Sequence, residues 1–168
     1  MKTTLARLKT MVDTANNAGG DLTYVKHVEI IHPEIGLTLV SKASLPAIFI
    51  TPVGTVERWV ASQEKEAVHT VALYCVMAYH QRESALMGDS TRPAGQGKGI
   101  VDFAADVMGV VRGHRLAVDG THWLTRPIDL TNVTYIVEQL GEHGHVQVAE
   151  LTLEGGRVFL QTTLPGNV

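Results

Sequence analysis

The C-terminal part of the chain reads HVQVAELTLEGGRVFL from His145 to Leu160. Its apolar residues fall into two runs of strand-forming side chains, which predicts two β-strands. Between the runs stand Glu154, Gly155 and Gly156, a combination typical of a tight turn. We therefore expect the chain to close on a β-hairpin that turns at these glycines.

A further strand is expected just upstream of this hairpin. Residues 130–140 alternate through Val133, Tyr135 and Val137, and residues 141–144 form a turn signal. Within the closing stretch the apolar phase slips after Val148, which predicts a β-bulge near residues 149–150. The last third of the chain is therefore predicted to be all strand.

Two segments have helical periodicity. The first follows Thr3 or Thr4 as a possible N-cap and stops at Gly19 and Gly20. The second ends at Arg112-Gly113, where a cation and a glycine are favoured. Their apolar stripes are made of Leu5, Leu8, Val12 and Ala15 in the first, and of Ile100, Phe103, Ala104, Val107 and Val111 in the second.

The remaining elements are predicted to be strands. Residues 24–30 read as a short edge strand, and residues 45–52 as a strand bracketed by Pro46 and Pro52, with both faces covered. Residues 68–80 alternate over the longest run and fit a central strand. Residues 55–66 are compatible with a short helix, but we favour the outgoing arm of a hairpin that turns near residues 63–65.

Together these elements predict an α+β fold: a mostly antiparallel sheet with two main helices packed on one face. The 168 residues, 45% of them hydrophobic, suit one compact domain over residues 1–168. Residues 88–99 are rich in glycine and polar side chains, so we expect a mobile loop there.

Composition excludes several classes of function. The net charge of −3 provides no basic field for binding nucleic acid. No stretch reaches the roughly 18 apolar residues of a membrane span, so a soluble protein is expected. The single cysteine, Cys75, lies in an apolar run and is expected to be a small buried side chain of a protein made in a reducing compartment.

The glycines at 95, 97 and 99 surround Lys98 and precede a helix, where backbone amides can cradle a phosphate. The spacing fails the Walker motif, because Gly99 stands where Ser or Thr is required and Arg92 where the first glycine is required. A flexible loop is therefore favoured. A small nucleotide-binding protein that uses this loop stays open as an alternative.

Other catalytic patterns are missing from the sequence. The eight histidines make no zinc signature, and no serine stands in a nucleophile elbow. Asp102 and Asp106 share one helix face, which is more typical of a solvated surface than of paired catalytic carboxylates. We expect no catalytic residue, no cofactor, no metal and no enzymatic activity. Trp59 and Trp123 suit either interface anchors or half-buried core positions.

The order of elements resembles the tail terminator (tail completion) proteins of long-tailed bacteriophages. The resemblance runs from the N-terminal helix through the proline-bounded strand 45–52 and the strand 69–79 to the helix after the polar loop and the final strands. It covers most of the chain and rests on pattern and order rather than on active-site residues.

This resemblance implies a structural virion protein at the head-proximal end of the tail, assembled in the host cytoplasm. It implies a hexameric ring that caps the tail tube, ends its polymerisation and meets a head-side connector protein, with DNA passing through the ring. Another neck or connector component is the alternative within the same class. The candidate assembly interface contains Ile48, Ile50, Trp59, Arg92, Lys98 and Trp123.

Overall fold

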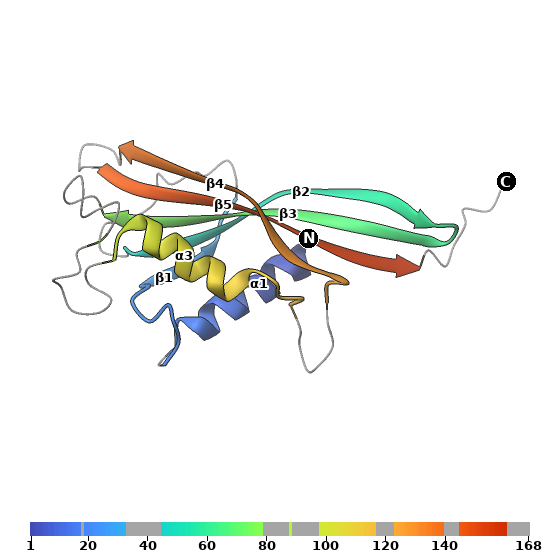
Figure 1. Ribbon diagram of the computed structural model, residues 1–168, viewed down its shortest axis with the longest axis horizontal. Coiled ribbons are helices and arrows are strands. Elements are labelled where there is room, and N and C mark those ends of the chain that lie inside the picture. The colour runs from blue at the N-terminus through green and yellow to red at the C-terminus, as the bar shows by residue number, and fades with distance from the viewer. Residues whose placement is uncertain are drawn as a thin grey trace.

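The computed structural model describes residues 1–17, 19–32, 45–78, 88, 98–116, 123–139 and 145–160. Figure 1 shows helices and strands in the order expected from the sequence, which confirms the α+β fold. The elements are α1 (Lys2–Ala15), β1 (His27–Ile30), β2 (Ala47–Ala61), β3 (Glu64–Ala78), α3 (Ile100–Val111), β4 (Arg126–Gln139) and β5 (His145–Leu160).

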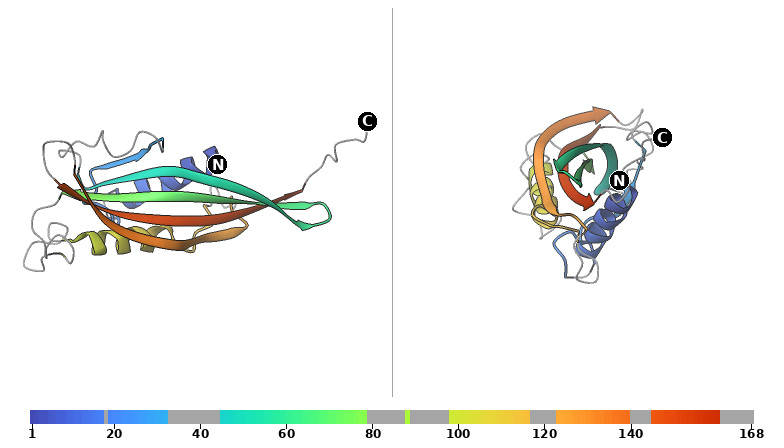
Figure 2. Two further views of the ribbon diagram at one scale, coloured as in Figure 1. Left: turned by 90° about the horizontal axis from the view of Figure 1, so that it is seen from above. Right: turned by 90° about the vertical axis from the view of Figure 1, so that its right-hand side faces the viewer.

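The five strands form one sheet in the order β1-β2-β3-β5-β4. Strand β1 is parallel to β2, and all other neighbours are antiparallel. The prediction of a central strand is confirmed by β3, which pairs with β2 on one side and with β5 on the other. Seen along its long axis, the sheet is strongly coiled (Figure 2), as expected from the twist of long strands.

Both helices pack on the same face of the sheet, as predicted. The core between them contains Leu8 and Val12 of α1 and Phe103 and Val107 of α3, all almost completely buried. On the sheet side it contains alternate residues of the three middle strands: Ile48, Ile50, Val71, Leu73, Cys75, Ala149, Leu151 and Leu153.

A second apolar cluster lies on the other face of the sheet. It contains Ala47 and Phe49 of β2, Val76 of β3, and Val146 and Val148 of β5. Residues 47–50 of β2 are therefore buried on both faces, as their continuous apolar run predicts. The alternation predicted for β3 is confirmed as well.

The helix ends follow the expected signals in part. Helix α1 begins after Met1 rather than at a threonine cap, and Thr4 is buried. Its stop is confirmed: Gly19 has a φ of +89°, and a Cβ on Gly20 would lie 2.0 Å from the carbonyl oxygen of Ala15. Only glycine fits such a close backbone approach.

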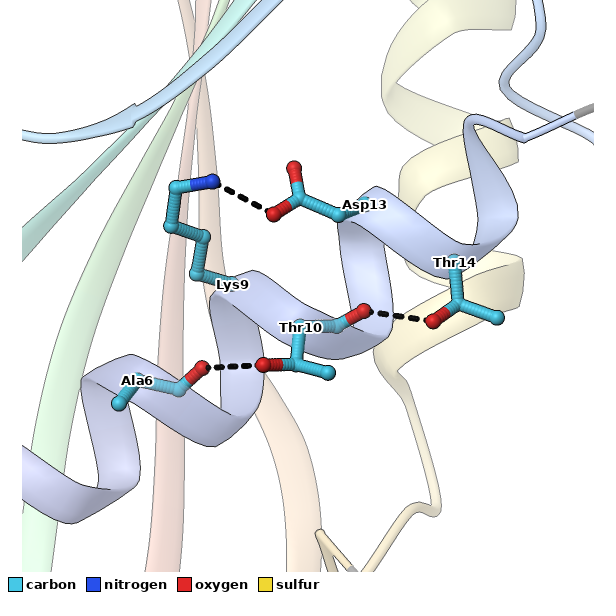
Figure 3. A network of polar contacts seen from close by, with 5 residues as sticks. All are labelled: Ala6, Lys9, Thr10, Asp13 and Thr14. Atoms are coloured by element: carbon cyan, nitrogen blue, oxygen red, sulfur yellow. Dashed lines mark hydrogen bonds and ion pairs between the residues drawn. The ribbon is translucent and has the colours of Figure 1, made fainter.

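On the outer side of α1, polar side chains bond to other groups of the same helix. Figure 3 shows Lys9 Nζ 2.5 Å from Asp13 Oδ2, a pair one turn apart on the helix. Thr10 and Thr14 each donate their hydroxyl hydrogen to the carbonyl four residues earlier, at 3.0 and 2.8 Å. This side of α1 is an ordinary hydrated helix surface.

Strand β2 is longer than predicted. The sequence suggested that it ends at Pro52, but β2 continues to Ala61 and turns back at residues 62–63, which confirms the hairpin and rules out the short helix. Pro52 is tolerated because the last β2 residue paired with β1 is Ile50, so one edge of β2 is already free at Pro52.

The predicted C-terminal hairpin is wrong: β5 is one strand from His145 to Leu160, and Gly155 and Gly156 lie inside it. Its pairing with β3 also runs without a register shift, so the bulge predicted near residues 149–150 is absent from β5. The register shifts of this region lie in β4 instead, near its start.

Close packing explains the two glycines. A Cβ on Gly155 would lie 2.7 Å from Leu124 Cδ1, and a Cβ on Gly156 would lie 2.1 Å from Glu66 Oε1. Neighbouring residues of a strand point to opposite faces, so each glycine leaves room for a side chain on a different face of the sheet. The pair marks close approach by side chains rather than a turn.

The carboxylate that Gly156 accommodates is held by two arginines. Glu66 Oε2 lies 2.6 Å from Arg58 Nη2 and 2.8 Å from Arg58 Nε, and Glu66 Oε1 lies 3.5 Å from Arg126 Nε. The Glu66 side chain is only 6% exposed. These contacts join β2, β3 and the start of β4, so they fix the sheet where the helices end.

The strands extend well past the helices. A 14-residue helix is about 21 Å long, whereas a 15-residue strand is about 50 Å long. We call the end of the sheet that extends past the helices the arm: residues 53–61 of β2, 64–70 of β3 and 154–160 of β5. Figure 1 shows these strands running on beyond α1 and α3.

The core predicts a large effect for Phe103→Ala. Phe103 is 0% exposed, so its removal should lower the free energy of unfolding by about 3 to 5 kcal/mol. Urea denaturation measures this change. Val60→Ala on the arm is the control and should cost less than about 0.5 kcal/mol; a cost below 1 kcal/mol for Phe103→Ala would contradict this core.

The packing around Gly156 predicts opposite effects for two alanine substitutions. Gly156→Ala should destabilise the fold by about 1 to 3 kcal/mol, because the new methyl group displaces the Glu66 carboxylate from its arginines. Gly109→Ala should stabilise it by up to about 1 kcal/mol, since this α3 position has open space around it. Thermal unfolding of both variants checks the pair; equal shifts would contradict the Glu66 contact.

Candidate interaction surface

Most of the exposed large apolar side chains of the described residues lie on the arm. Val53, Val56, Trp59 and Val60, all on β2, are between 51% and 66% exposed. Isolated exposed apolar residues are common, but four within eight residues of one strand concentrate exposed apolar surface there, on both of its faces. We call these four residues the arm strip.

Two register shifts explain why the sequence pattern did not show the strip. The pairing of β2 with β3 shifts between Pro52 and Gly54 and again between Trp59 and Ala61, so that Val53 and Val60 fall outside the regular alternation. Val56 is paired with Val68, and Trp59 is paired with Lys65. The side chains of these two pairs point to opposite faces of the sheet. Strict period-two reasoning cannot detect apolar residues distributed in this way.

Trp59 is one of the predicted interface residues, and its ring is available on the surface. The Lys65 ammonium lies 4.7 Å from the centre of the Trp59 ring, and Lys65 Nζ lies 3.9 Å from Glu57 Oε2. The apolar strip is therefore bordered by charged groups. An apolar centre with a charged border is the usual composition of a protein-protein interface.

Ile48 and Ile50 were also expected at an interface, and this part of the prediction is wrong for the folded subunit. Both are 0% exposed and belong to the core beneath the helices. Their position follows from β2 itself, since only its first residues are flanked by β1 and covered by helices.

Trp123 lies inside the subunit's own packing. Its ring centre is 4.8 Å from the guanidinium carbon of Arg7 and 3.6 Å from that of Arg157. Its Nε1 donates a hydrogen bond to Thr4 Oγ1 at 3.1 Å. Trp123 therefore joins α1 to β5 by cation-π and hydrogen-bond contacts, which favours the half-buried core alternative.

Lys98 and Asp106 form a small polar cluster with Tyr24. The Tyr24 hydroxyl donates to Asp106 Oδ2 at 2.6 Å, Lys98 pairs with the same oxygen, and Lys98 Nζ lies 4.8 Å from the Tyr24 ring centre. Burial, with the nearby Asp106 carboxylate, raises the pKa of the Tyr24 hydroxyl.

The expected solvated role of Asp106 is therefore wrong, since this carboxylate is internally paired. The charge of Lys98 is engaged in the same cluster, which leaves it poorly placed for a phosphate. The predicted interface residue Arg92, and the glycines at 95 and 97, lie outside the described residues.

Other chemical groups of the described residues give no site. Cys75 is fully buried, and burial raises the pKa of its thiol, in keeping with a core role. Searching the described ranges finds no group of three or more His, Cys, Asp or Glu side chains able to hold a metal ion. None of the helices in the described part of the chain is long and apolar enough to span a membrane.

A second exposed apolar patch lies on β4, where Tyr135 and Val137 are 42% and 56% exposed. The sequence pattern identified both as strand residues but not as surface residues. Ile30 of β1 is also exposed, at 37%. Only the order and pairing of the strands show what these residues share with the arm strip: each lies where its strand has a neighbour on one side alone among the described residues.

His69 lies buried where the arm meets the body of the subunit. Its Nδ1 lies 3.0 Å from Thr55 Oγ1, across the β2–β3 pair. Burial lowers the pKa of His69 below its usual value of 6.5, and the positive charges of the N-terminal amine and Arg157 add to this effect.

The lowered pKa predicts that the protein loses stability below about pH 6.5. In that range the unfolded chain binds a proton at His69 that the folded protein excludes, so the free energy of unfolding falls as pH falls. Urea denaturation at pH 7.5 and pH 5.5 measures the change. His69→Gln should show a smaller loss between these pH values, and an equal loss in both proteins would contradict this assignment.

No protein-family model matches this chain, and no curated protein matches its sequence. Among solved structures the chain is similar to one described as the virion of a native gene transfer agent (GTA) particle. The two chains are 13% identical, the likeness covers 89% of this chain and 82% of the other, and the TM-score is 0.35.

Proposed function

We propose that this protein is a structural component of a phage-like virion that caps the head-proximal end of the tail tube. In this proposal identical subunits form a hexameric ring, which ends polymerisation of the tube and presents a surface to the head-side connector. The support is the resemblance to tail terminator proteins in the order of elements, together with the surface described above. The protein acts by assembly, without catalysis.

The observation that carries the proposal is the arm strip. Side chains as large as Trp59 and Val56 are more than half exposed on strands that no helix of the described part covers. Exposed apolar surface concentrated on one strand in this way supports a site that another protein covers. The contacts of Glu66 with Arg58 and Arg126 hold this surface in a fixed position relative to the body.

A closed ring explains how such a subunit would end a tube. Head-to-tail contacts between identical subunits give an open filament unless the rotation between them closes the circle, and a closed ring offers no further end for growth. The net charge of −3 fits a ring through which DNA passes without strong phosphate binding. Tube protein would meet one face of the ring and connector protein the other.

The test is removal of the gene from the phage-like element that encodes the chain, followed by electron microscopy of the particles. We expect tails of irregular and excessive length that do not join heads. Complementation with Trp59→Glu should fail, whereas Lys9→Gln on the hydrated side of α1 should restore normal particles. Tails of normal length that fail only to join heads would favour a neck or connector role, and wholly normal particles would overturn the proposal.

A further inference from the structure

We propose that copies of this chain join by strand addition, with the free edge of β2 on one copy pairing with the free edge of β4 on the next. This inference rests on the proposed function in assuming that the partner is a second copy of the chain. It adds which two surfaces meet, and that the contact is head-to-tail and staggered.

The first observation is where the exposed apolar residues lie. All large apolar side chains of the described residues that are exposed belong to β1, β2 or β4. The inner strands β3 and β5 contribute none of them. Exposed apolar surface is thus confined to the two sides of the sheet, where an added strand would cover it.

The second observation concerns the backbone. Strand β1 pairs only with residues 47–50 of β2, so the described residues provide residues 52–61 with a partner on the β3 side alone. Strand β4 likewise pairs only with β5. Both edges therefore present backbone donors and acceptors that a strand of another molecule can use.

The middle of the β4 edge also lacks the usual protection against such pairing, since Pro127 and the charged residues of β4 lie towards its two ends. Residues 130–137 read LTNVTYIV, without a charge and without a proline. Monomeric proteins normally place lysine, proline or a short strand at an exposed edge. An uncharged edge of this length, with Tyr135 and Val137 exposed, fits a permanent partner better than solvent.

Two features favour pairing of β2 with β4 over pairing of two identical edges. Neighbouring strands from β2 to β4 alternate in direction, and β2 is antiparallel to β4, so adding β4 of the next copy beside β2 continues the antiparallel sheet. In addition, one repeated contact of this kind covers both edges of every copy and can close into a ring. Pairing of β2 with β2 would leave every β4 edge uncovered.

The register requires an offset between copies. Across the sheet, Thr51 of β2 is level with Asn132 of β4, through Ala72 and Thr152. The free part of β2 extends from this level towards the tip of the arm, whereas residues 133–139 of β4, with the exposed Tyr135 and Val137, extend the opposite way. Pairing them shifts the next copy along the strands, so that the arm of one subunit lies over the body of its neighbour.

The test uses two double variants, each of which damages one edge. The arm variant carries Val56→Lys and Trp59→Lys, and the β4 variant carries Tyr135→Lys and Val137→Lys. All four residues are exposed, so both variants should fold, which thermal unfolding followed by circular dichroism checks. The control, Thr10→Lys with Thr14→Lys, adds the same charge to the hydrated side of α1.

Native mass spectrometry over a concentration series measures assembly, with one variant isotopically labelled. Wild type and control should form rings, and each variant alone should remain monomeric. An equal mixture should give a dimer with one copy of each variant and nothing larger, because the arm variant keeps an intact β4 edge and the β4 variant keeps an intact arm.

Assembly of the β4 variant into dimers by itself would show pairing of two β2 edges and overturn the proposal. A wild-type protein that stays monomeric at every concentration would also overturn it. The tail-length experiment is independent of both outcomes: a protein that controls tail length but uses other contacts refutes the strand addition alone, whereas normal tails after gene removal refute the proposed function.

Discussion

The constraint on which the rest of the structure depends is the pairing of β3 along its whole length, unbroken with β5 and interrupted only by two register shifts with β2. All fifteen residues of β3 have a partner on β5, and most have one on β2. This pairing keeps three strands extended over a length that helices of 12 and 14 residues cannot cover. The body with its two-sided core and the uncovered arm are therefore two parts of one sheet.

Holding an uncovered arm in place requires contacts that do not depend on a large core. The carboxylate of Glu66 supplies them by contacting arginines of β2 and β4 at once, and Gly156 leaves the space for it. A buried carboxylate is costly without partners, so this arrangement depends on all of its members being present. Stacking of Arg7 and Arg157 on Trp123 joins α1 to β5 in the same region.

An arm with exposed apolar side chains is a liability for a protein that works alone, because free strand edges pair with whatever strands they meet. In the proposed closed assembly the same features would be the means of association, and their confinement to the free edges of the sheet limits where a partner can bind. The fold thus has two distinct parts. The helix-covered body contains the core, and the free edges expose apolar side chains and backbone groups.

Local pattern by itself determined the fold class and most elements of this protein. The stripe around Phe103 specified α3, and the alternation through Leu73 specified the central strand, because helices and strands have fixed periods of side-chain direction. The pattern also placed the short β1, the β2–β3 hairpin and the burial of Cys75. These features depend on residues close together in the sequence, which is why they could be predicted.

The tertiary structure alone decided which apolar residues are exposed and which face the core. Gly155 and Gly156 have the composition of a turn, yet they lie in a straight strand because Leu124 and Glu66 occupy the space beside them. Ile48 was expected at an interface and is buried, whereas Val56 is exposed because the strands extend beyond the helices. Exposure depends on which distant segments cover a strand and on how far they extend, and one-dimensional periodicity does not contain that information.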